Sequence, residues 1–269
     1  MGTLYLVATP IGNLEDMSPR AVRILREARL IAAEDTRQTQ KLLIHFDIHT
    51  PVTSYFEHNK LTKLDSILAA LAEGDVALVS DAGMPAINDP GYELVRAALA
   101  SAFDISPIPG PSAPVAALAA SGLPTDSFLY LGYLPRKSSE RKTALKHAAD
   151  FPYTLIFLET PHRLIDSLKD LQIVLGNRQI ALARELTKIH EEIWRGTISE
   201  AIDYFKAPRG EFVLVIQGRK KEERKKWAEE ELLRAIKKEL ATKKSAKEIS
   251  SELAERSGWP KREVYKRIF

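Results

Sequence analysis

The residues best suited to chemistry follow short apolar segments of the chain. Glu34 and Asp35 come directly after one such segment, and Glu185 and Lys188 follow another. Carboxylates and amines exchange protons when their surroundings shift their pKa, and they also hold charged ligands. Charged residues at strand ends are commonly only solvated, so residue type alone does not establish a site. The elements around these residues must bring them together.

The segment Val79–Gly91 has the composition of a rigid loop that lines a pocket. The apolar run Val76–Val79 predicts a buried strand, which stops at a serine and an aspartate. Gly83 and Gly91 permit backbone conformations that a Cβ forbids, and two prolines between them fix φ. Such a loop suits a flat or extended small molecule. The alternative is a tight surface turn.

Over residues 1 to about 115, apolar strands alternate with helices, which predicts a parallel sheet covered on both faces. We expect strands at Leu4–Ala8, Leu30–Ala33, Val52–Tyr55, Val76–Val79 and Asp104–Pro107. In such sheets ligands sit beyond the carboxyl ends of the strands. The loops there are Thr9–Asp16, Glu34–Arg37, Ser80–Gly91 and Pro107–Pro114, all rich in Gly, Pro or charge. Their shared edge favours a ligand site over a surface turn.

Residues about 116 to 218 predict a second α/β domain. Its expected strands are Leu129–Leu131, Thr154–Leu158, Ile180–Ala183 and Phe212–Ile216. Charge again gathers at strand ends, at Glu159, His162, Arg163, Arg184, Glu185, Lys188 and Glu211. Because charged residues cluster at the strand ends of both predicted domains, we expect a cleft between the two domains. Clefts of that kind are preferred ligand sites.

Several classes of site are not indicated. None of the loops is G-x-G-x-x-G or a G-x-x-x-x-G-K-[ST] phosphate loop, so a standard dinucleotide or nucleoside triphosphate site is not expected. The amides at Ser112 and Ala113, where a small-residue helix begins, are suited to hold a carboxylate or carbonyl, although Ser112 can also simply cap that helix. With no cysteine and six histidines lacking ligand spacing, no metal is expected. No signal peptide or membrane span is evident, so we expect a cytoplasmic protein with no membrane contact.

Residues 219–269 differ in charge from the rest. They hold 17 Lys and Arg against 10 Asp and Glu, so +7 of charge lies here and −4 in residues 1–218. A charged linker, expected to be mobile, precedes a helix-turn-helix pattern with a capping box at Ser245 and a stop at Gly258. On a helical wheel Val264, Tyr265 and Ile268 share the inner arc, whereas Arg262, Lys266 and Arg267 point outward. Such a basic face suits an RNA backbone, although it can equally be only hydrated.

Eight motifs occur in order between Val7 and Glu192: VATPIGNLED, AEDTR, SDAGMPAINDPG, PGPSA, SGLPTDSF, GYLPRK, ETPHR and RELTKIHEE. Together they resemble the tetrapyrrole methylase superfamily, and within it the branch that methylates ribosomal RNA of the small subunit. The resemblance implies S-adenosyl-L-methionine bound between two α/β domains of a homodimer. It also implies methylation of a cytidine 2′-hydroxyl in the decoding region of 16S rRNA, within the small ribosomal subunit.

When the family's cofactor-binding positions are carried over to this sequence one by one, the resemblance implies that loops of both domains bind the cofactor. The implied contacts are Pro10, Ile11, Gly12, Asp81, Gly83, Met84, Ile87, Ser112, Ala113, Leu134 and Ala183, with the Gly210-Glu211 turn in addition. Met84 stands where the family usually has a small polar residue, so backbone contact carries over there but side-chain contact does not.

Methyl transfer from a sulfonium needs the 2′-oxygen to be positioned and its proton removed. The candidates for proton removal are Lys188 and Glu185, with Glu34 and Asp35 expected to face them. A desolvated lysine would be a better base than an unperturbed glutamate. The residues do not rank Lys188 against Glu185, and the two can also pair across a surface turn.

Arg37, His162, Arg163 and Arg184 are assigned to RNA phosphates as charged donors. Two other functions remain as alternatives. One is a methyltransferase of the same superfamily that acts on a tetrapyrrole, such as a precorrin or uroporphyrinogen. The other is a metabolite-sensing regulator that binds nucleic acid through its tail.

Overall fold

The computed structural model describes residues 2–219, 226–242 and 244–269. The chain divides into two compact units, Met1–Gly218 and Arg219–Phe269. Most of the charged linker expected around residues 219–226 lies outside the described residues.

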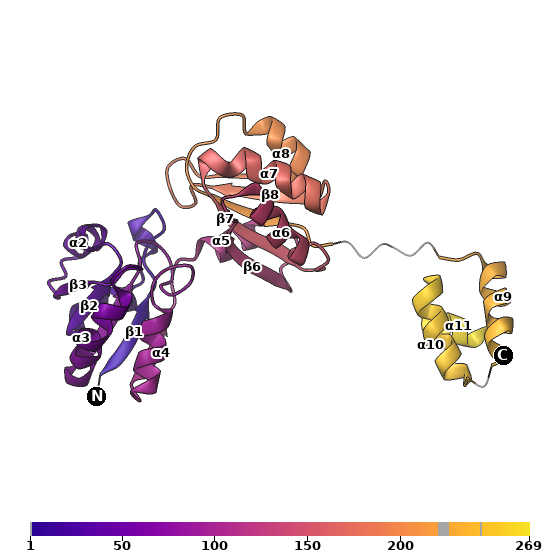
Figure 1. Ribbon diagram of the computed structural model, residues 1–269, viewed down its shortest axis with the longest axis horizontal. Coiled ribbons are helices and arrows are strands. Elements are labelled where there is room, and N and C mark those ends of the chain that lie inside the picture. Colours follow the sequence, from indigo (N-terminus) through magenta and orange to yellow (C-terminus); the bar gives the residue numbers. More distant parts are fainter. Residues whose placement is uncertain (1, 220–225, 243) are drawn as a thin grey trace. The chain divides into compact units, whose positions relative to one another are not determined.

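The first unit begins with a five-stranded parallel sheet in the order β3-β2-β4-β1-β5 (Figure 1). Its strands are β1 (Thr3–Val7), β2 (Leu30–Ala33), β3 (Val52–Ser54), β4 (Val76–Val79) and β5 (Asp104–Ile108). The parallel sheet predicted from the continuous apolar strands is therefore confirmed. All the loops that follow these strands start from the same edge.

Helices cover both faces of this sheet. The helices α1 (Pro19–Glu27) and α2 (Thr36–His45) pack on one face, and α3 (Lys60–Glu73) and α4 (Tyr92–Ala100) pack on the other. A short 3-10 helix, Leu14–Asp16, lies in the loop after β1. The sequence did not predict α2, because its first residues were interpreted as a charged loop. The Asp35 carboxylate accepts a hydrogen bond from the Arg37 amide and so caps α2.

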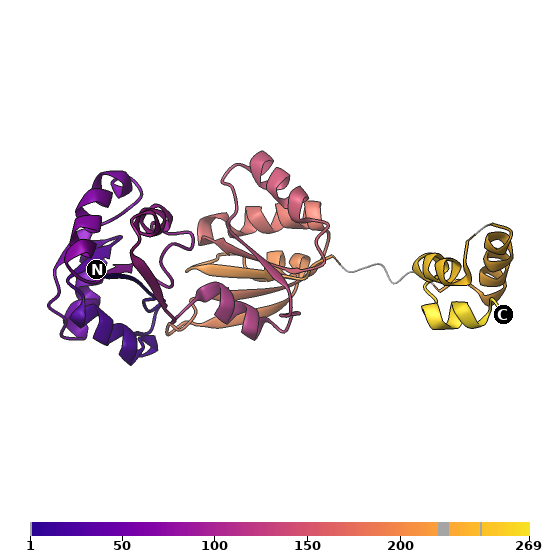
Figure 2. The same ribbon diagram turned by 90° about the horizontal axis from the view of Figure 1, so that it is seen from below.

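The second sheet has the order β6-β7-β10-β8-β9 and is mixed. Helices lie over both of its faces (Figure 2). Its strands are β6 (Phe128–Tyr133), β7 (Thr154–Glu159), β8 (Gln179–Arg184), β9 (Glu192–Thr197) and β10 (Phe212–Ile216). The central strand β10 runs antiparallel to both β7 and β8. The sequence missed β9 because an edge strand that is only half-buried carries no continuous apolar run.

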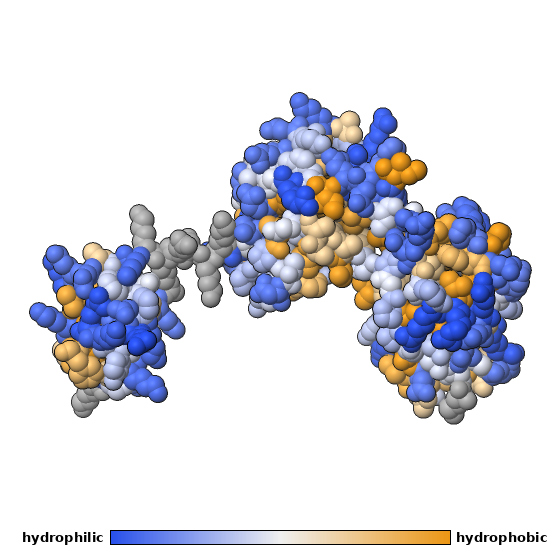
Figure 3. Space-filling view, turned by 180° about the vertical axis from the view of Figure 1, so that it is seen from behind, coloured by the Kyte–Doolittle hydropathy of each residue, from blue (hydrophilic) through white to orange (hydrophobic). Residues whose placement is uncertain are grey.

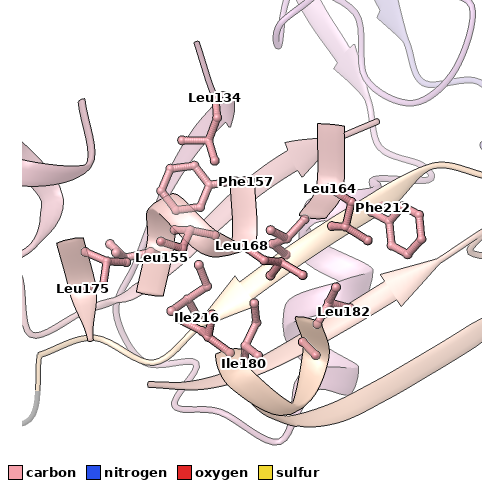
Figure 4. Packing of buried hydrophobic residues seen from close by; sticks show 14 of the residues in the cluster. Leu134, Leu155, Phe157, Leu164, Leu168, Leu175, Ile180, Leu182, Phe212 and Ile216 are labelled. Carbon is pink, nitrogen blue, oxygen red and sulfur yellow. The ribbon is translucent and has the colours of Figure 1, made fainter. Parts of the chain in front are cut away.

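The second sheet also has two covered faces. The helices α6 (Ser138–Ala148), α7 (Pro161–Leu175) and α8 (Ile198–Tyr204) bury one face, around Phe157 and Leu168 (Figure 4). The helix α5 (Ala113–Ser121) covers the opposite face. Each large apolar side chain buried in this way contributes about 1.5–3 kcal/mol relative to exposure. The layers hold the carboxyl end of β7 rigidly at the sheet edge.

The second unit is a three-helix module consisting of α9 (Glu229–Leu240), α10 (Ala246–Ser257) and α11 (Lys261–Lys266). Its own core contains Leu232, Ile236, Ile249, Leu253, Trp259 and Val264. The predicted capping box between Ser245 and Glu248 is present, and Gly258 ends α10 with φ of +70°. The helix-turn-helix pattern predicted for residues 245–269 is therefore confirmed.

The described part of the chain shows neither a membrane-spanning helix nor a metal-binding cluster. None of its helices is both long enough and apolar enough to cross a membrane. The same residues contain no group of three or more His, Asp or Glu placed to hold a metal ion.

Candidate active site

The loops after β1 and β4 are joined at the edge of the first sheet. The Thr9 amide donates to the Gly83 carbonyl at 2.9 Å, and the Gly83 amide returns a bond of 3.0 Å to the Thr9 carbonyl. The Thr9 hydroxyl also donates to the carbonyl of Ser80. Gly83 has φ of +80°, a conformation that glycine adopts without steric cost.

The loop after β5 meets the same pair of loops. A Cβ built on Gly83 would lie 3.6 Å from Ile11 Cγ2 and 3.7 Å from the Pro111 carbonyl oxygen. A Cβ on Gly110 would lie 2.9 Å from Ala8 Cβ, closer than carbon atoms normally approach. The loops after three strands therefore touch here, and the missing Cβ of Gly110 is what permits its approach to Ala8.

Two contacts join the loops at this edge to the second sheet. Gly12 lies against the loop that follows β8, where its Cβ would be 2.9 Å from Thr187 Oγ1 and 3.1 Å from the Leu186 carbonyl oxygen. A Cβ on Gly132, at the end of β6, would overlap the side chain of Asn88. The site-bearing edges of the two sheets thus face one another, as a cleft between two α/β domains requires.

The facing edge of the second sheet is formed by strand ends in register. Phe212 of β10 pairs with Glu159 of β7 on one side and with Arg184 of β8 on the other. Just before β10, the Glu211 amide donates to the Glu185 carboxylate at 2.9 Å, and Gly210 packs against the same side chain. The Gly210-Glu211 turn therefore adjoins the loop that contains Glu185.

The two facing loops share backbone strain. Ala86 and Asn88 in the loop after β4, and Glu185 and Thr187 in the loop after β8, all have φ between +50° and +67°. Such conformations cost non-glycine residues of order 1–2 kcal/mol each and concentrate at functional sites. The sequence pointed to Glu185 but missed Asn88 and Thr187. Asn88 could have been suspected because asparagine tolerates this region.

Lys188 is held as an ammonium ion. Its Nζ lies 3.0 Å from Glu185 Oε1 and 3.0 Å from Glu211 Oε2. Burial lowers the pKa of Lys188, but the hydrogen bonds to these two carboxylates outweigh burial and raise the pKa above its ordinary value. The pairing of Glu185 with Lys188, which the sequence left open as an alternative, is therefore present, and the pKa of Lys188 is raised and not lowered.

Glu34 and Asp35 are bound to the loop after β4. Glu34 accepts a bond from the Asp81 amide at 3.3 Å, and the Asp35 amide donates to the Asp81 carboxylate at 3.1 Å. Burial raises the pKa of Glu34, and the nearby charges of Asp89, Asp81 and Asp35 raise it further. Hydrogen bonds from Arg37 lower the pKa of Asp35 to about 2. Glu34 is thus the stronger proton acceptor of the two.

The other residues assigned to the cofactor differ in exposure. Pro10, Ile11, Met84 and Ala113 are half-buried, and Ile87 is 53% exposed. Ser112 occupies the N-cap position of α5, but its hydroxyl makes no capping bond, so the expected capping role is not observed. Leu134 and Ala183 are buried in the core, which limits any cofactor contact there to a backbone group or the edge of a side chain.

The residues assigned to phosphate differ in their exposure and in the partners they already have. The Arg37 side chain is 87% exposed, although its Nη2 lies 2.8 Å from the Asp35 carboxylate, and His162 is also exposed. Arg184 is partly engaged, because its Nε lies 3.2 Å from the Glu192 carboxylate. Arg163 is only 16% exposed and binds Glu159, so most of its guanidinium is already engaged within the protein.

Two surface grooves contain arginines assigned to RNA. A groove of about 650 Å³ is lined by Arg184, His190, Tyr204 and Lys206 among others. Another, of about 760 Å³, is lined by Arg37, His49 and neighbouring residues of α2 and β3.

The last helix of the chain presents a different face from the one predicted. Arg267, expected outside, binds Glu229 and Glu263 and stacks its guanidinium over Trp259 at 4.4 Å. Tyr265, expected inside, is 43% exposed and contacts Phe269 with ring centroids 5.5 Å apart. For Arg267 the helical wheel fails because α11 ends at Lys266 and the chain beyond it leaves the helical period. Val264 and Ile268 pack on the core of the module, as predicted.

Comparisons with known proteins agree with this geometry. Residues 3–202 match the family model of the tetrapyrrole (corrin/porphyrin) methylases. The chain is 50% identical over 270 residues to ribosomal RNA small subunit methyltransferase I of Halalkalibacterium halodurans, covering 98% of this chain and 93% of that one. The protein of the same name from Synechocystis sp. is 49% identical, with 98% and 96% covered.

Solved structures share the fold at lower identity. Uroporphyrin III C-methyltransferase from Thermus thermophilus superposes with a TM-score of 0.57 at 19% identity, covering 80% of this chain and 97% of that one. The methyltransferase CobJ gives a TM-score of 0.59 at 21% identity, covering 81% and 95%.

Proposed function

Since this chain belongs to the tetrapyrrole methylase family, we propose that it transfers a methyl group from S-adenosylmethionine to a ribose 2′-hydroxyl of a cytidine in 16S ribosomal RNA. The observation that carries the proposal is the sequence identity of 50% and 49%, over 98% of this chain, to relatives named as ribosomal RNA small subunit methyltransferases. The facing edges of the two sheets support it, because they bring the motif residues together.

The chain's own residues fit the cofactor. Thr187 Oγ1 is buried and has no hydrogen-bond partner among the described residues, and it lies beside Gly12. A buried hydroxyl without a partner is costly unless a ligand satisfies it. The Ser112 hydroxyl, which makes no capping bond, is a second polar group suited to the ligand. S-adenosylmethionine would supply an activated methyl group on a positively charged sulfur.

Glu34 is our candidate for the group that accepts the 2′-hydroxyl proton. Its raised pKa makes it a better base than an ordinary glutamate, and its bond to the Asp81 amide fixes it to a loop assigned to the cofactor. Lys188 stays charged and instead stabilises Glu185 and the turn at Glu211. Arg37 and His162 remain available for RNA phosphates.

The C-terminal module supports RNA contact through the outer face of α11. The face consists of Lys261, Arg262, Tyr265, Lys266 and Phe269, all of them exposed. The surface of this unit is mostly hydrophilic in the view of Figure 3. Aromatic rings that stack on unpaired bases beside cations that meet phosphates are typical of single-stranded RNA binding. We therefore assign this face to the ribosomal RNA.

Deleting residues 219–269 tests that assignment. Affinity for the small-subunit substrate should fall, and its dependence on salt should become shallower because fewer phosphates are neutralised. Affinity for S-adenosylmethionine should stay near normal. RNA affinity that is the same after the deletion would remove the module from the RNA interface.

We also propose a homodimer that works in the cytoplasm. The edge strand β6 exposes Phe128 by 43%, Leu131 by 44% and Tyr133 by 51%, which is apolar area that a second copy could cover. Sedimentation equilibrium should give twice the chain mass. Introducing Leu131→Asp should shift the protein toward the monomer if β6 lies in the interface.

The activity is tested by incubating the protein with radiolabelled S-adenosylmethionine and small ribosomal subunits that lack the modification. Digestion to nucleosides should place the label on a cytidine ribose. Label on an added porphyrinoid alone would select a tetrapyrrole methyltransferase. Binding to duplex DNA that responds to the cofactor, without methyl transfer, would select a regulator.

A further inference from the structure

Two buried ion pairs converge on the loop that follows β6. The loop, Leu134–Arg136, connects the edge strand to α6 and carries one residue assigned to the cofactor. Its three successive carbonyl oxygens accept hydrogen bonds from two arginines, Arg163 and Arg141. These hydrogen bonds fix the backbone of the loop more firmly than that of an ordinary surface loop.

The first pair is Glu159 and Arg163. The Glu159 side chain is fully buried at the end of β7, and its carboxylate accepts bonds from the Ser167 hydroxyl at 2.5 Å and the Thr160 amide at 2.9 Å. Arg163 lies in the first turn of α7, four residues after Glu159, with its Nε 3.3 Å from Glu159 Oε1. The same guanidinium donates through Nη2 to the carbonyls of Leu134 and Pro135.

The second pair is Asp170 and Arg141, both buried. Arg141 Nε lies 2.7 Å from Asp170 Oδ2, and its Nη1 donates to the carbonyls of Pro135 at 3.2 Å and Arg136 at 3.1 Å. Ser138 donates to the other Asp170 oxygen. Ser138 thus supports the ion pair.

The loop held in this way lies where both sheets meet. Gly132, two residues before it, packs on Asn88 of the first sheet's central loop. The pKa of the half-buried Tyr133 is raised by burial and by the charges of Glu211 and Asp89, which come from opposite sides of the site. The loop therefore borders the facing edges.

We propose that Arg163 and Arg141 are positioning residues that pre-form the Leu134–Arg136 wall of the methyl-donor site. The inference rests on the proposed function for the identity of the donor, S-adenosylmethionine. A loop whose carbonyls are all directed toward fixed guanidinium groups presents its amides and side chains in one arrangement. Fixing that arrangement before binding removes an ordering cost from binding.

The test compares arginine-to-lysine variants, because lysine keeps the charge but loses the fork that reaches two carbonyls. Arg163→Lys and Arg141→Lys should each weaken S-adenosylmethionine binding about tenfold, measured by calorimetry well below the melting temperature. KM for the methyl donor should rise in parallel. The kcat at saturating donor and KM for ribosomal subunits should change little.

Arg178→Lys is the matched control. Arg178 also donates to three carbonyls, those of Leu175, Ala149 and Gln217, but it does so at the start of β8 and not at its site-bearing end. It should lower stability to a similar extent without weakening donor binding. Pro135→Gly provides a second test, because it loosens the loop without removing either ion pair and should also weaken binding.

The outcomes separate the two proposals. Weaker donor binding in the two variants and in Pro135→Gly, but not in Arg178→Lys, supports the positioning role. Wild-type affinity in folded Arg163→Lys and Arg141→Lys would overturn it, as would an unchanged Pro135→Gly if the arginine variants do not fold. Failure of the unaltered protein to bind S-adenosylmethionine at all would overturn the proposed function itself.

Discussion

Lys188 lies directly over Gly12, so closely that a Cβ on Gly12 would come within 2.5 Å of Lys188 Cγ. The first residue belongs to the loop after β8 and the second to the loop after β1. The absence of a side chain at Gly12 is what lets the two sheets approach at this point. The contact also brings the buried Thr187 hydroxyl against the β1 loop.

Gly12→Ala should therefore impair the donor site. The Leu186 carbonyl is only 3.1 Å from the new carbon, so the backbone of the loop must move. We expect about 1–3 kcal/mol of lost stability and about tenfold weaker S-adenosylmethionine binding, measured by thermal denaturation and calorimetry. Gly176→Ala is the control: its φ of +80° costs about 1 kcal/mol, but nothing lies within 4 Å. Equal donor affinity in both variants would contradict the contact's role.

The pH profile should identify the proton acceptor. Because the pKa of Glu34 is raised above its ordinary 4.5, the carboxylate is lost as pH falls through that raised value, and kcat should fall with it. Glu34→Gln should lower kcat by about 10²–10⁴ and remove this acid limb. Lys188→Arg should retain most activity, since Lys188 acts as a cation. A Lys188→Arg variant that is inactive but folded, beside an active Glu34→Gln, would reverse the assignment.

The ion pair of Asp170 with Arg141 should make the stability of the protein depend on pH in the acid range. Burial raises the pKa of Asp170, but the bonds from Ser138, Arg141 and Lys142 outweigh it and lower the pKa below 3.8. Its contribution to stability is thus complete above pH 3.8 and is lost as pH falls through the lower folded value. Asp170→Asn should cost about 3 kcal/mol at pH 7 in urea unfolding, because Arg141 is left buried without its partner. The deficit should shrink below pH 3.8.

The exposed Asp166 on the same helix provides the control for that measurement. Asp166→Asn should change stability by less than about 0.5 kcal/mol at every pH. A deficit for Asp170→Asn that stays constant down to pH 2 would mean that the carboxylate's charge is not what stabilises the fold.

The two arginines Arg262 and Arg267 should behave in opposite ways. Arg267→Ala should lower the stability of the C-terminal module by about 1 kcal/mol, since it removes two ion pairs and the stack on Trp259. Arg262→Ala should leave stability unchanged but weaken RNA binding and reduce its salt slope by about one. Fluorescence anisotropy with labelled single-stranded RNA at several salt concentrations measures the RNA affinity and its salt slope. A salt slope that changes only in Arg267→Ala would contradict the assignment.

Local patterns were enough to predict much of the molecule. The run Val76–Val79 followed by Gly83 specified a buried strand and the loop after it, because period and turn chemistry are properties of neighbouring residues. Ser245 and Glu248 specified a capping box for the same reason. The parallel first sheet followed from alternating apolar strands and helices. The eight ordered motifs indicated the family, which the comparisons confirm.

Which partner each charged side chain has was decided only by tertiary structure. Arg163 was assigned to phosphate from its place after a strand, yet the packing of α7 buries it on Glu159 and on the Leu134 carbonyl. The residues alone did not rank Lys188 against Glu185 as a proton acceptor, and the structure pairs Lys188 with two carboxylates from different loops. A charge's pKa and role depend on groups distant in the chain, which the sequence order does not reveal. The residue types were therefore determined by the sequence, and their chemistry by the fold.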